Sequence, residues 1–196
     1  MIVSKWRYTN RVARPRTASD DEIVDRVAAH LAQRDWPTAT WTLAEVAPAA
    51  GLSPAGLVKR FGSRSGLLHA LGRHWVDSIP EEPSGALPPL DELREFARAT
   101  FGAQHRSAAL ASLGDLFADL ADETSAALLR DGGERQGRYV AALIRDAELK
   151  RAGDPLRAAR ILLDTMQGGL LRLGAGASGT DVAPDDTIDY FWKLWT

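Results

Sequence analysis

The 196-residue chain has no cysteine, and its four histidines are scattered. The first absence excludes disulfide scaffolds, thiolate catalysis and cysteine-ligated metals. The histidines also lack the paired spacing of a metal site, since even His69 and His74 are five residues apart and do not share a helical face. We therefore expect no metal and no cofactor.

Long apolar segments are also missing. No run of 18 apolar residues occurs, and the basic N-terminus is not followed by the apolar core of a signal peptide. These two absences predict a cytoplasmic protein that has no membrane partner.

Signatures of catalysis are equally scarce, because no nucleophile–base pair or phosphate-binding loop stands out. Asp115 and Asp119 are one helical turn apart, which a solvated helix face explains more simply than acid–base catalysis. The segment from Gly174 to Gly179 (GAGASG) formally matches the dinucleotide-binding fingerprint, but it lacks the preceding strand and the following helix that this fingerprint requires. We expect no enzymatic activity.

The net charge of −2 conceals an asymmetry between the two parts of the chain. Residues 1–76 contain 11 Lys/Arg and 6 Asp/Glu, whereas residues 77–196 contain 13 and 20. A basic front half suits a polyanion. Five cations precede the first acidic residue: Lys5, Arg7, Arg11, Arg14 and Arg16. This arm either reaches DNA phosphates or the minor groove, or it is a basic leader without a role.

The stretch from Thr42 to Leu68 carries the strongest motif. Thr42 followed three residues later by Glu45 predicts a capping box that begins one helix, and Gly51 suits the left-handed end of that helix. Ser53 and Pro54 then begin a second helix. A helix, a glycine-containing turn and another helix favour DNA binding in the major groove; the alternative is an ordinary helical hairpin.

The second helix has side chains that suit DNA binding. Small residues at its start let the backbone approach the DNA, and two basic residues come after them in the sequence. Arg64 opens the third helix, where its charge opposes the helix dipole and a DNA phosphate would relieve the conflict. The candidate DNA-binding residues are Thr42, Ser53, Pro54, Ala55, Gly56, Val58, Lys59, Arg60 and Arg64.

The segment Gly51–Leu68, GLSPAGLVKRFGSRSGLL, resembles the signature of TetR-family transcriptional regulators. The matching positions are Gly51, Ser53, Leu57, Phe61, Ser63, Leu67 and Leu68. The resemblance implies a homodimer with an N-terminal operator-binding domain of three helices and a C-terminal domain that binds a small effector.

Three positions depart from the family pattern. Val58 replaces a tyrosine that usually contacts a phosphate, the pair Ala55-Gly56 replaces glycine-threonine, and Arg64 replaces a lysine. The first two changes remove DNA contacts, for which Lys59 and Arg60 would compensate.

The remaining sequence has helical periodicity throughout, so the predicted fold class is all-α. We divide the chain into a basic N-terminal arm (1–18), a helix-turn-helix DNA-binding domain (19–62), a connecting helix (63–80), and a ligand-binding and dimerisation domain (81–196). In the last domain we predict helices near 90–104, 107–121, 123–150, 154–173 and 184–195, with a kink or break at Asp131–Gly133.

The last two helices are so apolar and aromatic that they should pack either on their own domain or on a second copy of the chain, and the resemblance implies the second copy. The predicted dimer-interface residues are Leu162, Gly169, Leu170, Leu173, Tyr190, Phe191 and Leu194. An effector cavity between the other helices would be mostly apolar, which favours a hydrophobic small molecule. Its candidate lining residues are Trp75, Phe96, Phe101, His105, Phe117, Tyr139 and Met166; the alternative is that these side chains belong to the hydrophobic core.

The leading hypothesis is therefore a homodimeric TetR-like repressor that leaves a palindromic operator in double-stranded DNA when a small hydrophobic effector binds. The alternative is a helical ligand-binding or scaffold dimer that has lost operator recognition, which the valine at position 58 motivates.

Overall fold

The computed structural model describes residues 18–33, 41–103, 105–177 and 183–196, and all the regular structure in these ranges is helical. The all-α prediction is confirmed. The described elements are α1 (Asp20–Ala32), α2 (Leu43–Ala50), α3 (Pro54–Phe61), α4 (Arg64–Ser78), α5 (Pro89–Phe101), α6 (Arg106–Leu120), α7 (Glu123–Asp146), the 3₁₀ helix η1 (Lys150–Ala152), α8 (Pro155–Gly174) and α9 (Pro184–Trp195). Residues 1–17 of the predicted basic arm lie outside the described residues.

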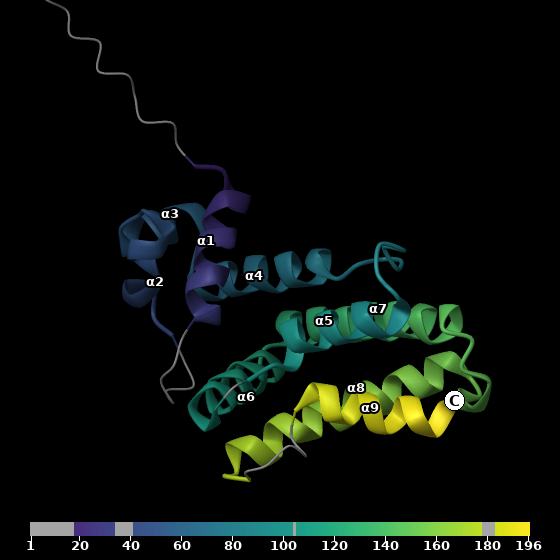
Figure 1. The fold of residues 1–196 in the computed structure, drawn as a ribbon. Coiled ribbons are helices and arrows are strands. Elements are labelled where there is room, and N and C mark those ends of the chain that lie inside the picture. The colour runs from purple at the N-terminus through teal and green to yellow at the C-terminus, as the bar shows by residue number, and fades with distance from the viewer. Residues whose placement is uncertain (1–17, 34–40, 104, 178–182) are drawn as a thin grey trace, which may run out of the picture.

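Helices α1–α3 form a small N-terminal unit around their own core (Figure 1). Ser19 and Glu22 close a capping box at the start of α1, which satisfies two backbone N–H groups that have no partner within the helix. Apolar side chains at helical spacing then face inward: Ile23, Val24, Val27, Trp41, Val46, Ala47, Ala50, Leu57 and Leu67 are buried together.

Helix α4 connects this unit to the rest of the molecule. It packs against α1 and α3 at one end and against α7 along its length, and it extends from the small domain over the layer formed by α5 and α7 (Figure 1). Ser63 caps it by accepting a hydrogen bond from the Gly66 N–H at 3.0 Å. One rigid element therefore contacts both the helix-turn-helix and the C-terminal domain.

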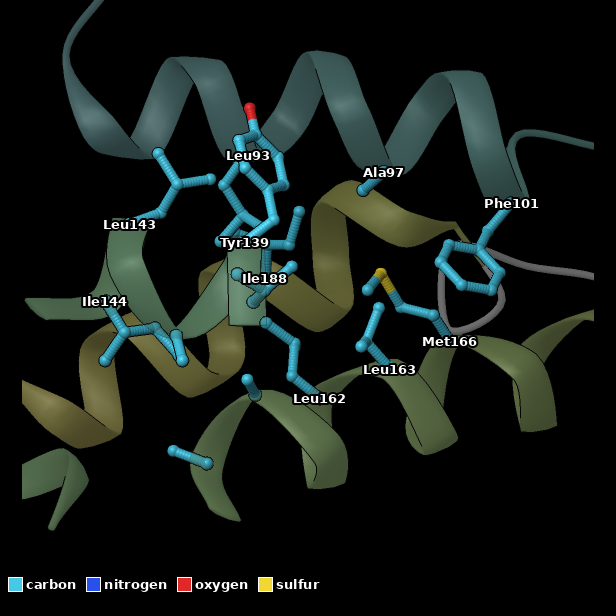
Figure 2. Close-up of a cluster of buried hydrophobic side chains, with 14 of the residues drawn as sticks. Leu93, Ala97, Phe101, Tyr139, Leu143, Ile144, Leu162, Leu163, Met166 and Ile188 are labelled. Atoms are coloured by element: carbon cyan, nitrogen blue, oxygen red, sulfur yellow. The ribbon is translucent and has the colours of Figure 1, made fainter. Parts of the chain in front are cut away.

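The C-terminal domain packs α5, α7, α8 and α9 around a second core (Figure 2). In this core α5 contributes Leu93 and Ala97, α7 contributes Tyr139 and Leu143, and α9 contributes Ile188. Helices α8 and α9 lie on the side of the domain away from α4 (Figure 1).

The expected kink or break at Asp131–Gly133 is wrong, because α7 runs as one helix through these residues. Gly132 serves another purpose there. A Cβ atom at this position would lie 2.2 Å from the Trp75 ring of α4, so the glycine lets the two helices approach closely. By contrast, a Cβ atom on neighbouring Gly133 would meet nothing within 4 Å.

Candidate nucleic-acid interface and effector cavity

The turn between α2 and α3 has the geometry that its sequence predicts. Thr42 and Glu45 form the capping box of α2, and Gly51 ends that helix in the left-handed region with φ of 67°. Ser53 Oγ then accepts the Gly56 N–H at 3.0 Å and begins α3, with Pro54 at its first turn. These local bonds hold α3 at a defined angle to α2.

The outer face of α3 carries small side chains, as expected. Ser53, Pro54 and Ala55 are exposed, and Val58 is 43% exposed although it is apolar. Leu57, on the opposite face, is completely buried and anchors α3 to the core. Thr42, the remaining small candidate outside this helix, is exposed as well.

The three expected cations differ in their surroundings. Lys59 is exposed, and no ion pair of its ammonium group is found within the described residues. Arg60 instead donates from Nε to the carboxylate of Asp20 on α1, so its charge is partly neutralised. Arg60 would therefore have to exchange Asp20 for a phosphate in order to compensate for the missing family contacts.

Arg64 is also engaged within the chain. Its Nε donates to the Trp41 carbonyl oxygen at 2.8 Å, and its guanidinium carbon lies 4.3 Å from the centroid of the Trp41 ring. This cation–π contact ties the start of α4 to the loop before α2. The sequence correctly predicted a positive charge at the start of this helix, but it did not predict the contact between that charge and the indole ring of Trp41.

One exposed cation was missed by the sequence reasoning. Arg26 lies on the outward face of α1, and a Cβ atom on Gly51 would come within 3.6 Å of its Nη1. The arginine thus sits beside the α2–α3 turn. Only its position opposite the buried stripe of α1 could have indicated this.

The predicted effector residues do not line one cavity, which corrects that expectation. Trp75, Phe96 and Tyr139 meet around one hollow, whereas Phe101 and His105 border a separate one. Phe117 is 64% exposed on α6, and Met166 is buried in the core of the C-terminal domain, so neither lines these two hollows. His105 also caps α6 through Nδ1, which accepts the Ala108 N–H at 3.3 Å.

The hollow that brings three of these aromatic residues together, here called the α4–α5–α7 cavity, has a volume of about 590 Å³. It lies between the C-terminal end of α4, the following loop, α5 and α7. Its lining residues are Trp75, Ser78, Ile79, Pro80, Ser84, Leu87, Glu92, Glu95, Phe96, Ala99, Thr100, Gln136 and Tyr139. Its size is in the range of small-molecule sites.

A buried carboxylate, which the sequence reasoning missed, lies in this cavity wall. Glu92 accepts the Tyr139 hydroxyl at 2.8 Å, the Ser84 N–H at 2.7 Å and the Ser84 hydroxyl at 2.9 Å. Burial alone would raise the pKa of Glu92, but these hydrogen bonds and one from Gly85 hold the pKa below its ordinary value. Burial and the bond to Glu92 raise the pKa of Tyr139, so the phenol stays a donor.

A second hollow of about 520 Å³, here called the junction cavity, lies between the N-terminal unit and α6 and α7. Trp41, Arg64, Trp75, Asp115 and Asp119 are among its lining residues. Burial, and next the neighbouring carboxylate of Asp115, raise the pKa of Asp119 to about 6. Asp119 is therefore not the simple solvated carboxylate that its spacing suggested.

The predicted dimer-interface residues fall into two groups, one buried in or packed on the core of this chain and one exposed. Leu162, Gly169 and Leu170 are buried within the domain's own core, and Leu173 and Phe191 pack against it, so these five serve the monomer. Tyr190 and Leu194 remain 67% and 55% exposed on α9. Two exposed apolar residues of α8, Ile161 and Leu171, were not predicted.

These features define an all-α fold with two hydrophobic cores and an N-terminal helix-turn-helix. A crystal structure from Rhodococcus sp. that is assigned to the TetR family of transcriptional regulators matches this chain with a TM-score of 0.63 and 22% sequence identity. The match covers 90% of this chain and 98% of that one. The chain therefore has a TetR-like fold, which confirms the resemblance at the level of the fold. No family model and no curated protein matches the sequence.

Across the described ranges, every helix is too short or too polar to span a membrane.

Proposed function

We propose that this protein is a homodimeric, DNA-binding transcriptional repressor that leaves a palindromic operator when a small hydrophobic molecule occupies its C-terminal domain. The observation that carries the proposal is the exposed, capped α3, whose outer face presents small side chains and Lys59 while Leu57 anchors it. Small residues on a recognition helix allow close approach to base edges. Two such helices in a dimer would enter successive major grooves about 34–36 Å apart.

The distribution of charge along the chain also supports DNA binding. In the sequence, the +5 excess of residues 1–76 equals the five cations of the basic arm, because the other charges of this segment cancel. We infer that the arm supplies much of the attraction to phosphates, with Lys59 and Arg26 adding contacts beside the turn.

The effector would act through α4. This helix borders the α4–α5–α7 cavity at one end and packs on α1 and α3 at the other. A ligand that favours one position of α4 would shift the population between dimer shapes with different spacing of the two α3 helices.

Salt-dependent binding to the DNA that flanks its own gene tests the proposal. Wild-type affinity should fall steeply as salt rises, and Lys59→Gln should reduce the slope of log affinity against log salt by about 0.9, the value for one lost phosphate contact. Lys150→Gln, which removes the same charge from η1 in the other domain, should leave the slope unchanged. Arg60→Gln should change it less than Lys59→Gln, because Asp20 already engages Arg60.

Failure to bind this DNA at low salt would instead favour the ligand-binding or scaffold dimer. One observation motivates that second candidate: two of the three cations expected at the interface are engaged inside the chain.

A further inference from the structure

The charged groups among the described residues that line the α4–α5–α7 cavity are all acidic. Glu92 and Glu95 bring two carboxylates from successive turns of α5, and no Lys, Arg or His side chain is among the described residues that line this cavity. Glu92 as a residue is only 8% exposed, and the three groups that donate hydrogen bonds to its carboxylate are all neutral. A buried carboxylate without a counter-ion makes the cavity electronegative.

Two nearby arginines form ion pairs outside this cavity, although the Nε of Arg135 is buried without a hydrogen-bond partner among the described residues. Arg135, next to Gln136 on α7, donates from Nη2 to Glu81 at 3.0 Å. Arg98 of α5 forms a two-bond pair with Asp185 of α9, with distances of 2.9 and 2.8 Å. Neither arginine is among the residues of the cavity wall, although Arg98 also attracts the exposed Glu95 carboxylate one helical turn before it; no ion pair of Glu92 is found among the described residues.

Two further features favour a positive ligand. Helix α4 ends against the cavity at Ser78, and the C-terminal end of a helix dipole is partially negative. Gln136 is only 7% exposed yet lines the cavity, and no hydrogen bond of its side-chain amide occurs within the described chain. Its side-chain carbonyl oxygen is therefore available to a ligand that enters the cavity.

The apolar part of the wall is aromatic. Trp75 and the edge-to-face pair of Phe96 and Tyr139, whose ring centroids are 5.0 Å apart, come from three different helices. Aromatic rings attract organic cations through their electron-rich faces and also bury apolar ligand surface.

From this combination we propose that the α4–α5–α7 cavity binds a hydrophobic organic cation, held between the carboxylates of α5 and the surrounding aromatic rings. The proposal rests on the proposed function only for the consequence of binding, the release of DNA. It narrows the effector from any hydrophobic molecule to one that carries a positive charge.

A pair of probes that differ in charge but hardly in size or shape tests this assignment. Isothermal titration of the full chain with tetraphenylphosphonium and with tetraphenylborate should show at least tenfold tighter binding of the cation. Glu95→Gln should weaken binding of the cation by about three- to tenfold, since Glu95 is partly screened by solvent. Glu92→Gln should weaken it more, and its thermal unfolding should be recorded, because Glu92 also holds Ser84 and Tyr139.

The matched control is Glu134→Gln. Glu134 is exposed two residues before Gln136 and therefore on the opposite face of α7, so its loss should change the affinity less than twofold. Equal affinity for the two probes, or equal effects of the variants at positions 95 and 134, would overturn the assignment. Because the Glu95 side chain is exposed, the Glu95→Gln variant should unfold at the wild-type temperature, which separates loss of charge from misfolding.

The experiments can refute the proposed repressor function and the proposed cation site independently of each other. Preferential binding of the cation by a protein that binds no DNA would refute the repressor and support the cavity assignment. Specific DNA binding without preference for the cation would do the reverse.

Discussion

Asp119 shows how the environment of one residue sets its chemistry. Its folded pKa of about 6 lies above its ordinary value, so folding disfavours the charged form. The free energy of unfolding should therefore fall as pH rises from about 4 to about 6 and stay level above that range, as far as this group contributes. The carboxylate costs stability at neutral pH.

We accordingly expect Asp119→Asn to raise the free energy of unfolding by about 1 kcal/mol at pH 7.5, a value reduced for partial solvent exposure, and by nothing at pH 4. Urea denaturation at both pH values measures this. Asp131→Asn, whose side chain is 62% exposed on α7, is the control and should show no such pH-dependent gain. An equal gain at both pH values for Asp119→Asn would show that charge is not the cause.

At the scale of elements, the contact between α4 and α7 depends on Gly132. An alanine there would place its Cβ atom against the rigid Trp75 ring, so the helices must separate or the indole must move. We expect Gly132→Ala to lower the free energy of unfolding by about 2 kcal/mol, since the clash outweighs the gain in helix propensity.

The adjacent glycine provides the matched control. Gly133→Ala adds a methyl group to open space on the same helix, so it should stabilise the protein by about 0.5–1 kcal/mol. Thermal unfolding of both variants would show shifts of opposite sign. Stabilisation by both would mean that α4 does not pack on α7 as described.

At the scale of the whole molecule, the proposed dimer would use the surface that the monomer core leaves exposed. Leu171 of α8 and Tyr190 of α9 are 56% and 67% exposed and belong to the two helices expected at the interface. We expect the double variant Leu171→Glu/Tyr190→Glu to weaken dimerisation by at least about 100-fold, or roughly 3 kcal/mol, because two-fold symmetry buries each new charge twice.

Sedimentation velocity over a range of concentrations measures the change. Phe117→Glu introduces the same charge at a site 64% exposed on α6 and should leave the dimer intact. A wild-type protein that remains monomeric at micromolar concentration would contradict the proposed dimer.

Local signals were enough to predict much of this protein. The capping boxes at Ser19 and Thr42, the left-handed Gly51 and the cap at Ser53 involve residues only a few positions apart, so the sequence itself determines where α1–α3 begin and turn. Helical periodicity likewise located α5–α9 and the all-α class.

Tertiary structure alone decided which of these residues are available for function. Arg60 meets an aspartate 40 positions away, and Leu162 faces the domain's own core although its pattern equally suits a dimer. Glu92 joins Tyr139 across 47 positions. Periodicity shows that a helix face is apolar or charged, but the partner of that face depends on long-range packing, which no local pattern contains.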